Sequence, residues 1–348
     1  MTNLLPEELV GQFFGVGSLG ETDHNSPLVY MKNLVMPYSF QITALREEDM
    51  IRQFGSTVDN YEEKGDFILD SDIHTYREIT GENEPILPNE AHMHSLYSLM
   101  DGTIYPYFKT QQTAPATMCF SIRGSDGKQL LNRSMFHFFE SLMFRIALGQ
   151  MKRIQSFCKT IILCQDDPGL GFVRNMIETH QVTDISLKQI VEKTDDIYPS
   201  GAIPAYHYCD DWRDLKKDDW YILWESKPKL AHIDVVRYPP DITSEQAEKM
   251  NEFMRKGGAL AIGVLPNVDD AYSSTVLETL DKNLTSTLTK MINSGIDANL
   301  VQRNTMISTQ CGLSGASIPL TREIHEQSIH FKSMFLDILE RISRKTPK

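Results

Sequence analysis

The chain has 348 residues, 41% of them hydrophobic, and its 34 Lys and Arg against 47 Asp and Glu give a net charge of −13. This composition excludes a collagen-like or largely disordered chain. Because acidic proteins repel phosphate backbones and anionic lipids, we expect neither nucleic acid nor a membrane as a partner. The chain has no basic start and no apolar run of about 18 residues, so we expect a cytoplasmic location.

Apolar segments of strand length alternate along the chain with longer segments of helical length. Eight such segments span 13–19, 66–70, 117–124, 159–164, 202–209, 232–238, 259–266 and 304–311. Their apolar character is continuous rather than alternating, which indicates strands buried on both faces of a parallel sheet. Eight strands alternating with helices predict an α/β fold, a single (β/α)8 TIM barrel over residues 1–348.

Several helices carry distinct sequence signals. Residues 134–157 have a wide apolar face at a spacing of three to four residues. Thr243, with Gln246 three residues later, predicts the start of a helix that ends at Gly257. Two further helices are predicted over 273–294 and 320–344.

Residues 71–116 show neither pattern and are rich in Pro, Asn, His and Tyr. We expect an irregular insertion after the second strand. In a barrel, an insertion of this kind caps or shapes the mouth of the active site.

Three residues with metal-ligating side chains follow two of the predicted strands. His207 and Cys209 end the fifth strand, and Cys311 ends the eighth. Residues two apart in an extended segment project to the same side, and all barrel strands deliver their carboxyl ends to one mouth. The pattern therefore indicates a metal site. The alternative is that the two cysteines are small buried side chains and His207 is a hydrogen-bonded rim residue.

Carboxylates end the fourth predicted strand. Asp166 and Asp167 stand immediately before Pro168 at this position. We expect them to be catalytic carboxylates that orient the substrate at the barrel mouth, the alternative being a solvated turn.

Further candidates for substrate binding follow other strands. Ser18 and Asp23 come after the first strand, and Arg123, for which a surface ion pair is the favoured alternative, comes after the third. Asp211 follows the metal pair, and either it or Asp210 is expected to bond the second nitrogen of His207 or to cap a helix. The remaining cysteines, which lie in apolar runs and are expected in the core, are Cys119, Cys158 and Cys164.

Four motifs together resemble those of a known group of barrels. They are GVGSLGETD at 15–23, LCQDDPGLG at 163–171, HYCDDW at 207–212 and STQCGLSGAS at 308–317. In order and spacing they resemble the cobalamin-independent methionine synthase and uroporphyrinogen decarboxylase superfamily, most closely its single-domain members, which include corrinoid-dependent methyltransferases. The similarity extends from about Gly15 to the last helix. It implies a zinc ion, held by His207, Cys209 and Cys311, that activates a thiol for alkylation.

The sequence departs from this family at two places. The stretch 233–240 contains no Glu where methionine synthases supply a further zinc ligand, and Asp167 replaces the usual Glu of the fourth-strand motif. The resemblance therefore implies a zinc-dependent methyltransferase with a three-residue ligand set. The expected methyl donor is methylcobalamin or a methyl-corrinoid protein, and the expected acceptor is a small thiol such as homocysteine or coenzyme M.

Two other functions stay open at this point. A non-catalytic or corrinoid-binding partner protein would retain the barrel without the reaction, because fold alone does not fix function. A decarboxylase of the uroporphyrinogen type would need several Arg near the first strand to hold substrate carboxylates, and 10–24 contains none.

Overall fold

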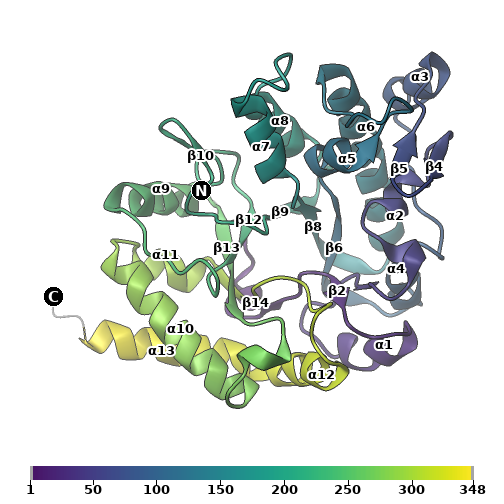
Figure 1. Ribbon diagram of the computed structural model, residues 1–348. Coiled ribbons are helices and arrows are strands. Elements are labelled where there is room, and N and C mark those ends of the chain that lie inside the picture. Colours follow the sequence, from purple (N-terminus) through teal and green to yellow (C-terminus); the bar gives the residue numbers. More distant parts are fainter. Residues whose placement is uncertain (1–2, 346–348) are drawn as a thin grey trace. The chain divides into compact units, whose positions relative to one another are not determined.

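The computed structural model describes residues 3–345 and separates the chain into two compact units (Figure 1). The first unit comprises Met1–Ala44 and Ile203–Lys348, and the second comprises Leu45–Ala202. Within the described residues, every helix is too short or too polar to serve as a membrane span.

Parallel strands form the centre of the first unit. In spatial order they are β1 (Phe13–Phe14), β14 (Thr305–Thr309), β13 (Ala259–Leu265), β12 (Leu230–Asp234) and β9 (Ala202–His207). Every neighbouring pair in this order is parallel. All residues of β12 and β13 are buried, as the continuous apolar patterns predicted. The predicted α/β class is confirmed.

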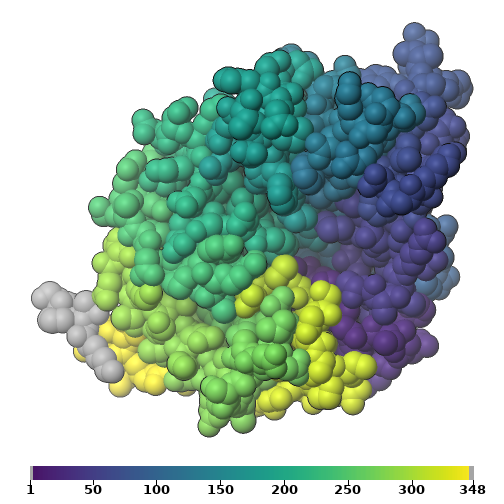
Figure 2. Space-filling model, viewed as in Figure 1, coloured from purple at the N-terminus to yellow at the C-terminus, as the bar shows by residue number. Residues whose placement is uncertain are grey.

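Helices cover these strands in the first unit. They include α9 (Ser244–Arg255), α10 (Val276–Asn293), α11 (Ala298–Arg303), α12 (Ile318–Gln327) and α13 (Phe331–Lys345). Helix α10 packs on β13 and against α13, and Figure 2 shows α10 and α12, in yellow-green and yellow, on the surface of the viewed face. The Thr243 side chain accepts a hydrogen bond from the Gln246 backbone N–H at the start of α9, as predicted. Gly257 follows α9 with φ of 103°, a left-handed conformation that glycine adopts readily.

Smaller elements of the first unit lie near the chain start. They are η1 (Glu7–Leu9), β2 (Ser18–Leu19), α1 (Asn25–Met31) and β3 (Gln41–Ile42), with β2 and β3 paired in parallel. A short antiparallel pair, β10 (Lys216–Lys217) and β11 (Trp220–Tyr221), and η3 (Asp269–Ala271) lie further along the chain. The helix predicted over 320–344 is two helices, because the turn η4 (Ser328–His330) separates α12 from α13.

The second unit is built on one long parallel strand pair, β6 (Tyr105–Thr113) and β8 (Cys158–Asp166). Its helices are α2 (Arg52–Gly55), α3 (Ile73–Gly81), α4 (His94–Leu99), α5 (Pro115–Ser121), α6 (Arg133–Ile154), α7 (Leu170–Glu178) and α8 (Leu187–Asp196), with the turn η2 (Arg46–Glu48). A separate small sheet contains β4 (Tyr61–Glu63), β5 (Phe67–Leu69) and β7 (Ile122–Arg123).

Two predictions for the second unit are wrong. The strand predicted over 117–124 is mostly helix α5, because Pro115 in its first turn favours a helical start. The segment 71–116, predicted to be irregular, contains α3, α4 and the long strand β6. The apolar pattern did not predict strand β6, because most of its buried residues are polar. Two of them, Thr110 and Gln112, form hydrogen bonds with Gln150 of α6.

Candidate metal centre

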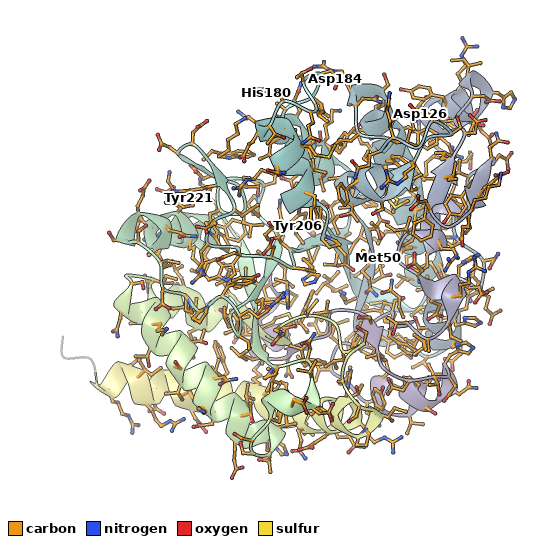
Figure 3. All side chains as sticks on the ribbon, in the orientation of Figure 1. Met50, Asp126, His180, Asp184, Tyr206 and Tyr221 are labelled. Carbon is orange, nitrogen blue, oxygen red and sulfur yellow. The ribbon has the colours of Figure 1, made fainter. Side chains whose placement is uncertain are left out.

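Two strand ends of the first unit bring an imidazole and two sulfurs together. His207 is the last residue of β9, and Cys311 lies two residues beyond the end of β14. Cys209 Sγ lies 2.8 Å from His207 Nε2 and 3.8 Å from Cys311 Sγ, and Cys311 Sγ lies 3.7 Å from His207 Nε2. The imidazole is buried, whereas both sulfur-bearing residues are half-buried. Figure 3 labels Tyr206, the residue before His207, on β9.

The pKa of the Cys311 thiol is lowered at this point. The neighbouring Cys209 side chain, and after it His207, stabilise the thiolate and outweigh burial, which acts in the opposite direction. The thiolate is both the nucleophilic form of cysteine and the form that binds metals. The arrangement therefore offers a neutral nitrogen and at least one anionic sulfur to a shared ligand.

A second buried histidine stands behind His207. The Nδ1 atoms of His207 and His232 lie 2.7 Å apart, and the two residues are register partners on β9 and β12. His232 Nε2 lies 3.0 Å from Ser308 Oγ and 2.9 Å from the Thr309 carbonyl oxygen. His207 is thus connected through His232 to the strand that carries Cys311.

An ion pair supports the backbone that carries Cys209. Arg237 Nε lies 2.7 Å from Oδ2 of the fully buried Asp234, and its Nη2 donates to the Cys209 carbonyl oxygen at 2.7 Å. Burial raises the pKa of Asp234, although the hydrogen bonds from Arg237 act to lower it. The carboxylate and guanidinium together fix the turn after β12 to the turn after β9.

Other candidates of the first unit surround this centre to different degrees. Ser18 lies against the loop that carries Cys311. Its Oγ is so near Gly312 that a Cβ on this glycine would stand 2.0 Å away, and the Ser18 carbonyl oxygen accepts a hydrogen bond from the Leu313 N–H. Asp23 is exposed and accepts from the N–H groups of the two residues at the start of α1. The structure thus brings Ser18, but not the Asp23 carboxylate, into contact with the loop of a candidate ligand.

The aspartates that follow Cys209 bond elsewhere than to His207. Asp211 forms an ion pair with Arg213 at 2.6 Å and caps a turn, and Asp210 accepts from the Tyr238 hydroxyl at 2.9 Å. The expectation that one of them bonds the second nitrogen of His207 or caps a helix is wrong. His232 occupies the place beside that nitrogen.

The remaining candidates belong to the second unit. Asp167 is buried and accepts from Thr117 Oγ1 at 2.6 Å, and that hydroxyl in turn accepts from the Gly169 N–H at 2.8 Å. Asp166, the last residue of β8, is partly buried beside it. Arg123 donates to the Gly127 carbonyl oxygen and lies 3.6 Å from Asp66, the surface ion pair favoured as its alternative. The other three cysteines, Cys119, Cys158 and Cys164, are buried, as predicted.

Sequence reasoning missed His232, Ser308 and Arg237. A signal for His232 was present: polar residues at 232 and 234 flank Ile233 in an otherwise apolar strand, so their side chains share one face. That face meets His207 only if β9 and β12 are neighbours in the observed register. The pattern of a single sequence does not reveal which residues of two strands are paired, so the contact could not be predicted.

Comparisons with known proteins concern the fold. No protein-family model and no curated protein matches this chain. It is similar to the solved structure of a B12-independent methionine synthase from a Shewanella species, determined in complex with selenomethionine, with a TM-score of 0.54 and 12% identity over 97% of this chain and 100% of that chain. A xylanase from Clostridium thermocellum, in complex with xylohexaose, gives a TM-score of 0.42 and 11% identity over 89% of this chain and 61% of that one. The first likeness supports a barrel-like α/β fold.

Proposed function

We propose that this protein is a zinc-dependent methyltransferase that transfers a methyl group to a thiol. The observation that carries the proposal is the convergence of His207 Nε2, Cys209 Sγ and Cys311 Sγ, which all lie within 4.8 Å of one another. Nitrogen and sulfur are the ligands that zinc prefers, and three protein ligands that leave a fourth position open are typical of catalytic zinc.

The distances support a fit to zinc. Bonds of about 2.3 Å to sulfur and 2.0 Å to nitrogen separate tetrahedral ligand atoms by about 3.5 to 3.8 Å. Two of the observed separations are 3.7 and 3.8 Å. The third, 2.8 Å between Cys209 Sγ and His207 Nε2, is a hydrogen-bond length, so the two atoms must move apart when a cation replaces the shared proton.

Zinc at this site would bind a substrate thiol as its thiolate. The thiolates of Cys209 and Cys311 would balance the charge of the ion, so a substrate sulfur held there would retain its negative charge and its nucleophilicity. In the transfer, the S–H proton leaves to solvent and an S–C bond forms. The bond between the methyl group and its donor breaks, and its electron pair stays on the donor.

The donor and acceptor follow from the family resemblance and are part of the proposal. We propose methylcobalamin or a methyl-corrinoid protein as donor and homocysteine or a coenzyme M-like thiol as acceptor. The similar Shewanella protein is covered over its whole length and is named B12-independent. A methylated folate is therefore included among the donors to be tested.

The remaining sequence-based roles complete the proposal. Asp166 and Asp167 are the proposed catalytic carboxylates, and the proposed substrate-binding residues are Ser18, Asp23, Arg123 and Asp211. The predicted single (β/α)8 barrel over residues 1–348, with 71–116 near its mouth, is also part of the proposal.

The test combines metal analysis with a transfer assay. Protein purified anaerobically should contain about one zinc per chain. It should convert a thiol to its methyl thioether, detected by mass spectrometry, with one donor from a panel of methylcobalamin and methyltetrahydrofolate. Cys311→Ser should abolish both, whereas Cys164→Ser, a buried cysteine of the second unit, should leave both unchanged. Far less than one zinc in the wild type would contradict the proposal. Full zinc without transfer to any thiol would favour a non-catalytic corrinoid-binding protein.

A further inference from the structure

We infer that His232 is a positioning residue that holds His207 in the tautomer whose Nε2 lone pair faces the two sulfurs. The inference rests on the proposed zinc site, because it assigns a role in that site to a residue that does not contact the metal. It follows from the directions of five hydrogen bonds.

The first step fixes the proton on His232 Nε2. This atom lies 2.9 Å from the Thr309 carbonyl oxygen, which can only accept, so Nε2 must donate. The second neighbour of Nε2, Ser308 Oγ at 3.0 Å, donates its own hydrogen to the Phe14 carbonyl oxygen at 2.7 Å. Its lone pairs therefore face His232. Both contacts require a hydrogen on Nε2.

The proton on His232 Nε2 also determines which nitrogen of His207 is protonated. In a neutral imidazole with a protonated Nε2, Nδ1 is an acceptor. The 2.7 Å contact between the two Nδ1 atoms contains one hydrogen, which must therefore belong to His207. His207 Nε2 is then unprotonated and accepts from the Cys209 thiol at 2.8 Å. A nitrogen in this state can ligate a metal without first losing a proton.

Packing holds His232 in place. Its side chain is fully buried, its ring stacks on Phe14 with centroids 5.8 Å apart, and it meets the His207 ring edge-on at 4.5 Å. The partners of His232 come from β1, β9 and β14, three strands of the same unit. The orientation of His207 is thus determined by the strand register rather than by flexible side chains.

The chemical nature of the partner also matters. Metal-ligating histidines usually donate their second N–H to a carboxylate, a backbone carbonyl or water. A carboxylate would add negative charge beside two thiolates, whereas neutral His232 adds none. Because Asp234, two residues along the same strand, is already paired with Arg237, its charge is largely balanced. The site therefore gains the orientation of His207 without a third anion.

Zinc affinity tests this role. His232→Leu removes the acceptor, whereas His232→Asn can place its amide oxygen near the former Nδ1 position. We expect the Leu variant to bind zinc about 10- to 100-fold more weakly in competition with a chromophoric chelator, and the Asn variant to recover most of this loss. The matched control is His325→Leu. His325 is equally buried in the same unit but bonds to Tyr38 and Thr321, so its variant should lose stability with unchanged zinc affinity.

A spectroscopic readout does not depend on metal. In metal-free protein labelled with 15N-histidine, long-range 1H–15N spectra should show His207 protonated on Nδ1 and His232 on Nε2, and the Leu variant should lose the single His207 tautomer. Finding the His207 proton on Nε2 in the wild type, or equal zinc affinity in wild type and His232→Leu, would overturn the inference. A wild type with this tautomer that binds no zinc would overturn the proposed function alone.

Discussion

The two units of this protein use cysteine in opposite ways. In the first unit, Cys209 and Cys311 are half-buried and lie next to an imidazole, and the neighbouring Cys209 and His207 side chains lower the pKa of Cys311. In the second unit, burial raises the pKa of Cys119 and Cys164, and raises that of Cys158 to about 11. A thiol therefore becomes reactive through the groups that can stabilise its anion, and loss of solvent alone makes it inert.

This contrast has a sequence basis. The inert cysteines stand inside helix α5 or strand β8, where the neighbouring side chains are mostly apolar. The reactive pair lies just beyond strand ends, where the chain turns and polar groups gather. The same rule separates packing residues from functional residues in many parallel-sheet proteins.

The largest expected effect is the loss of zinc affinity when one of the two cysteines near His207 is replaced. Cys311→Ser replaces a proposed thiolate ligand by a neutral hydroxyl, and we expect zinc affinity to fall by more than about a hundredfold, since even the loss of a residue behind a ligand costs 10- to 100-fold. Equilibrium competition with a chelator measures the effect. Cys158→Ser in the second unit is the control and should retain wild-type affinity. Equal losses in both variants would refute the distinction between the two groups of cysteines.

Arg237→Ala should weaken the support of the metal centre. The substitution leaves the buried Asp234 carboxylate without its guanidinium and frees the Cys209 carbonyl, so we expect the free energy of unfolding to fall by about 2 kcal/mol. Urea titration measures this loss, and zinc affinity should fall with it. Arg145→Ala is the comparison in the second unit, because Arg145 also donates to backbone carbonyls, those of Glu78 and Glu84. It should reduce stability without changing zinc affinity.

Alkylation should distinguish the two groups of thiols by rate. At pH 6 an ordinary thiol is almost fully protonated, so we expect iodoacetamide to modify Cys311 at least about tenfold faster than free cysteine. The three buried cysteines should react only after unfolding. Peptide mapping by mass spectrometry identifies the modified positions, and added zinc should protect Cys311. Early labelling of Cys164 would contradict the assignment.

The smallest expected effect is the pH dependence of stability that a buried histidine, His325, contributes. Burial lowers the pKa of His325 to about 4, below its ordinary value of 6.5. The unfolded chain thus binds more protons than the folded chain between these values, so stability is complete above pH 6.5 and declines as the pH falls toward 4. Between pH 7 and 5.5 we expect this histidine to cost about 1 kcal/mol of unfolding free energy. His325→Gln should flatten the profile, and an unchanged pH dependence would show that other groups dominate it.

The sequence was sufficient to predict the parallel α/β class, the start of α9 and the approach of His207, Cys209 and Cys311. These follow from local patterns: continuous apolar runs, a capping residue and ligands at strand ends. The rule that a continuous apolar run marks a buried strand failed at β6, because its buried residues include Lys109, Thr110 and Gln111, which form hydrogen bonds within the unit. It also failed to identify His232, because the role of that residue depends on register between strands that are distant in sequence.

The contact between Ser18 and the loop of Cys311 has a consequence for how the centre is assembled. The strand that carries Ser18 is synthesised long before this loop, and β1 pairs with β14 only when both are present. At synthesis rates of about 5–20 residues per second, roughly 5 to 20 seconds pass between the synthesis of Cys209 and that of Cys311. During that interval oxidation competes with completion of the centre, and the cell's reducing capacity decides how many chains mature with both sulfurs intact.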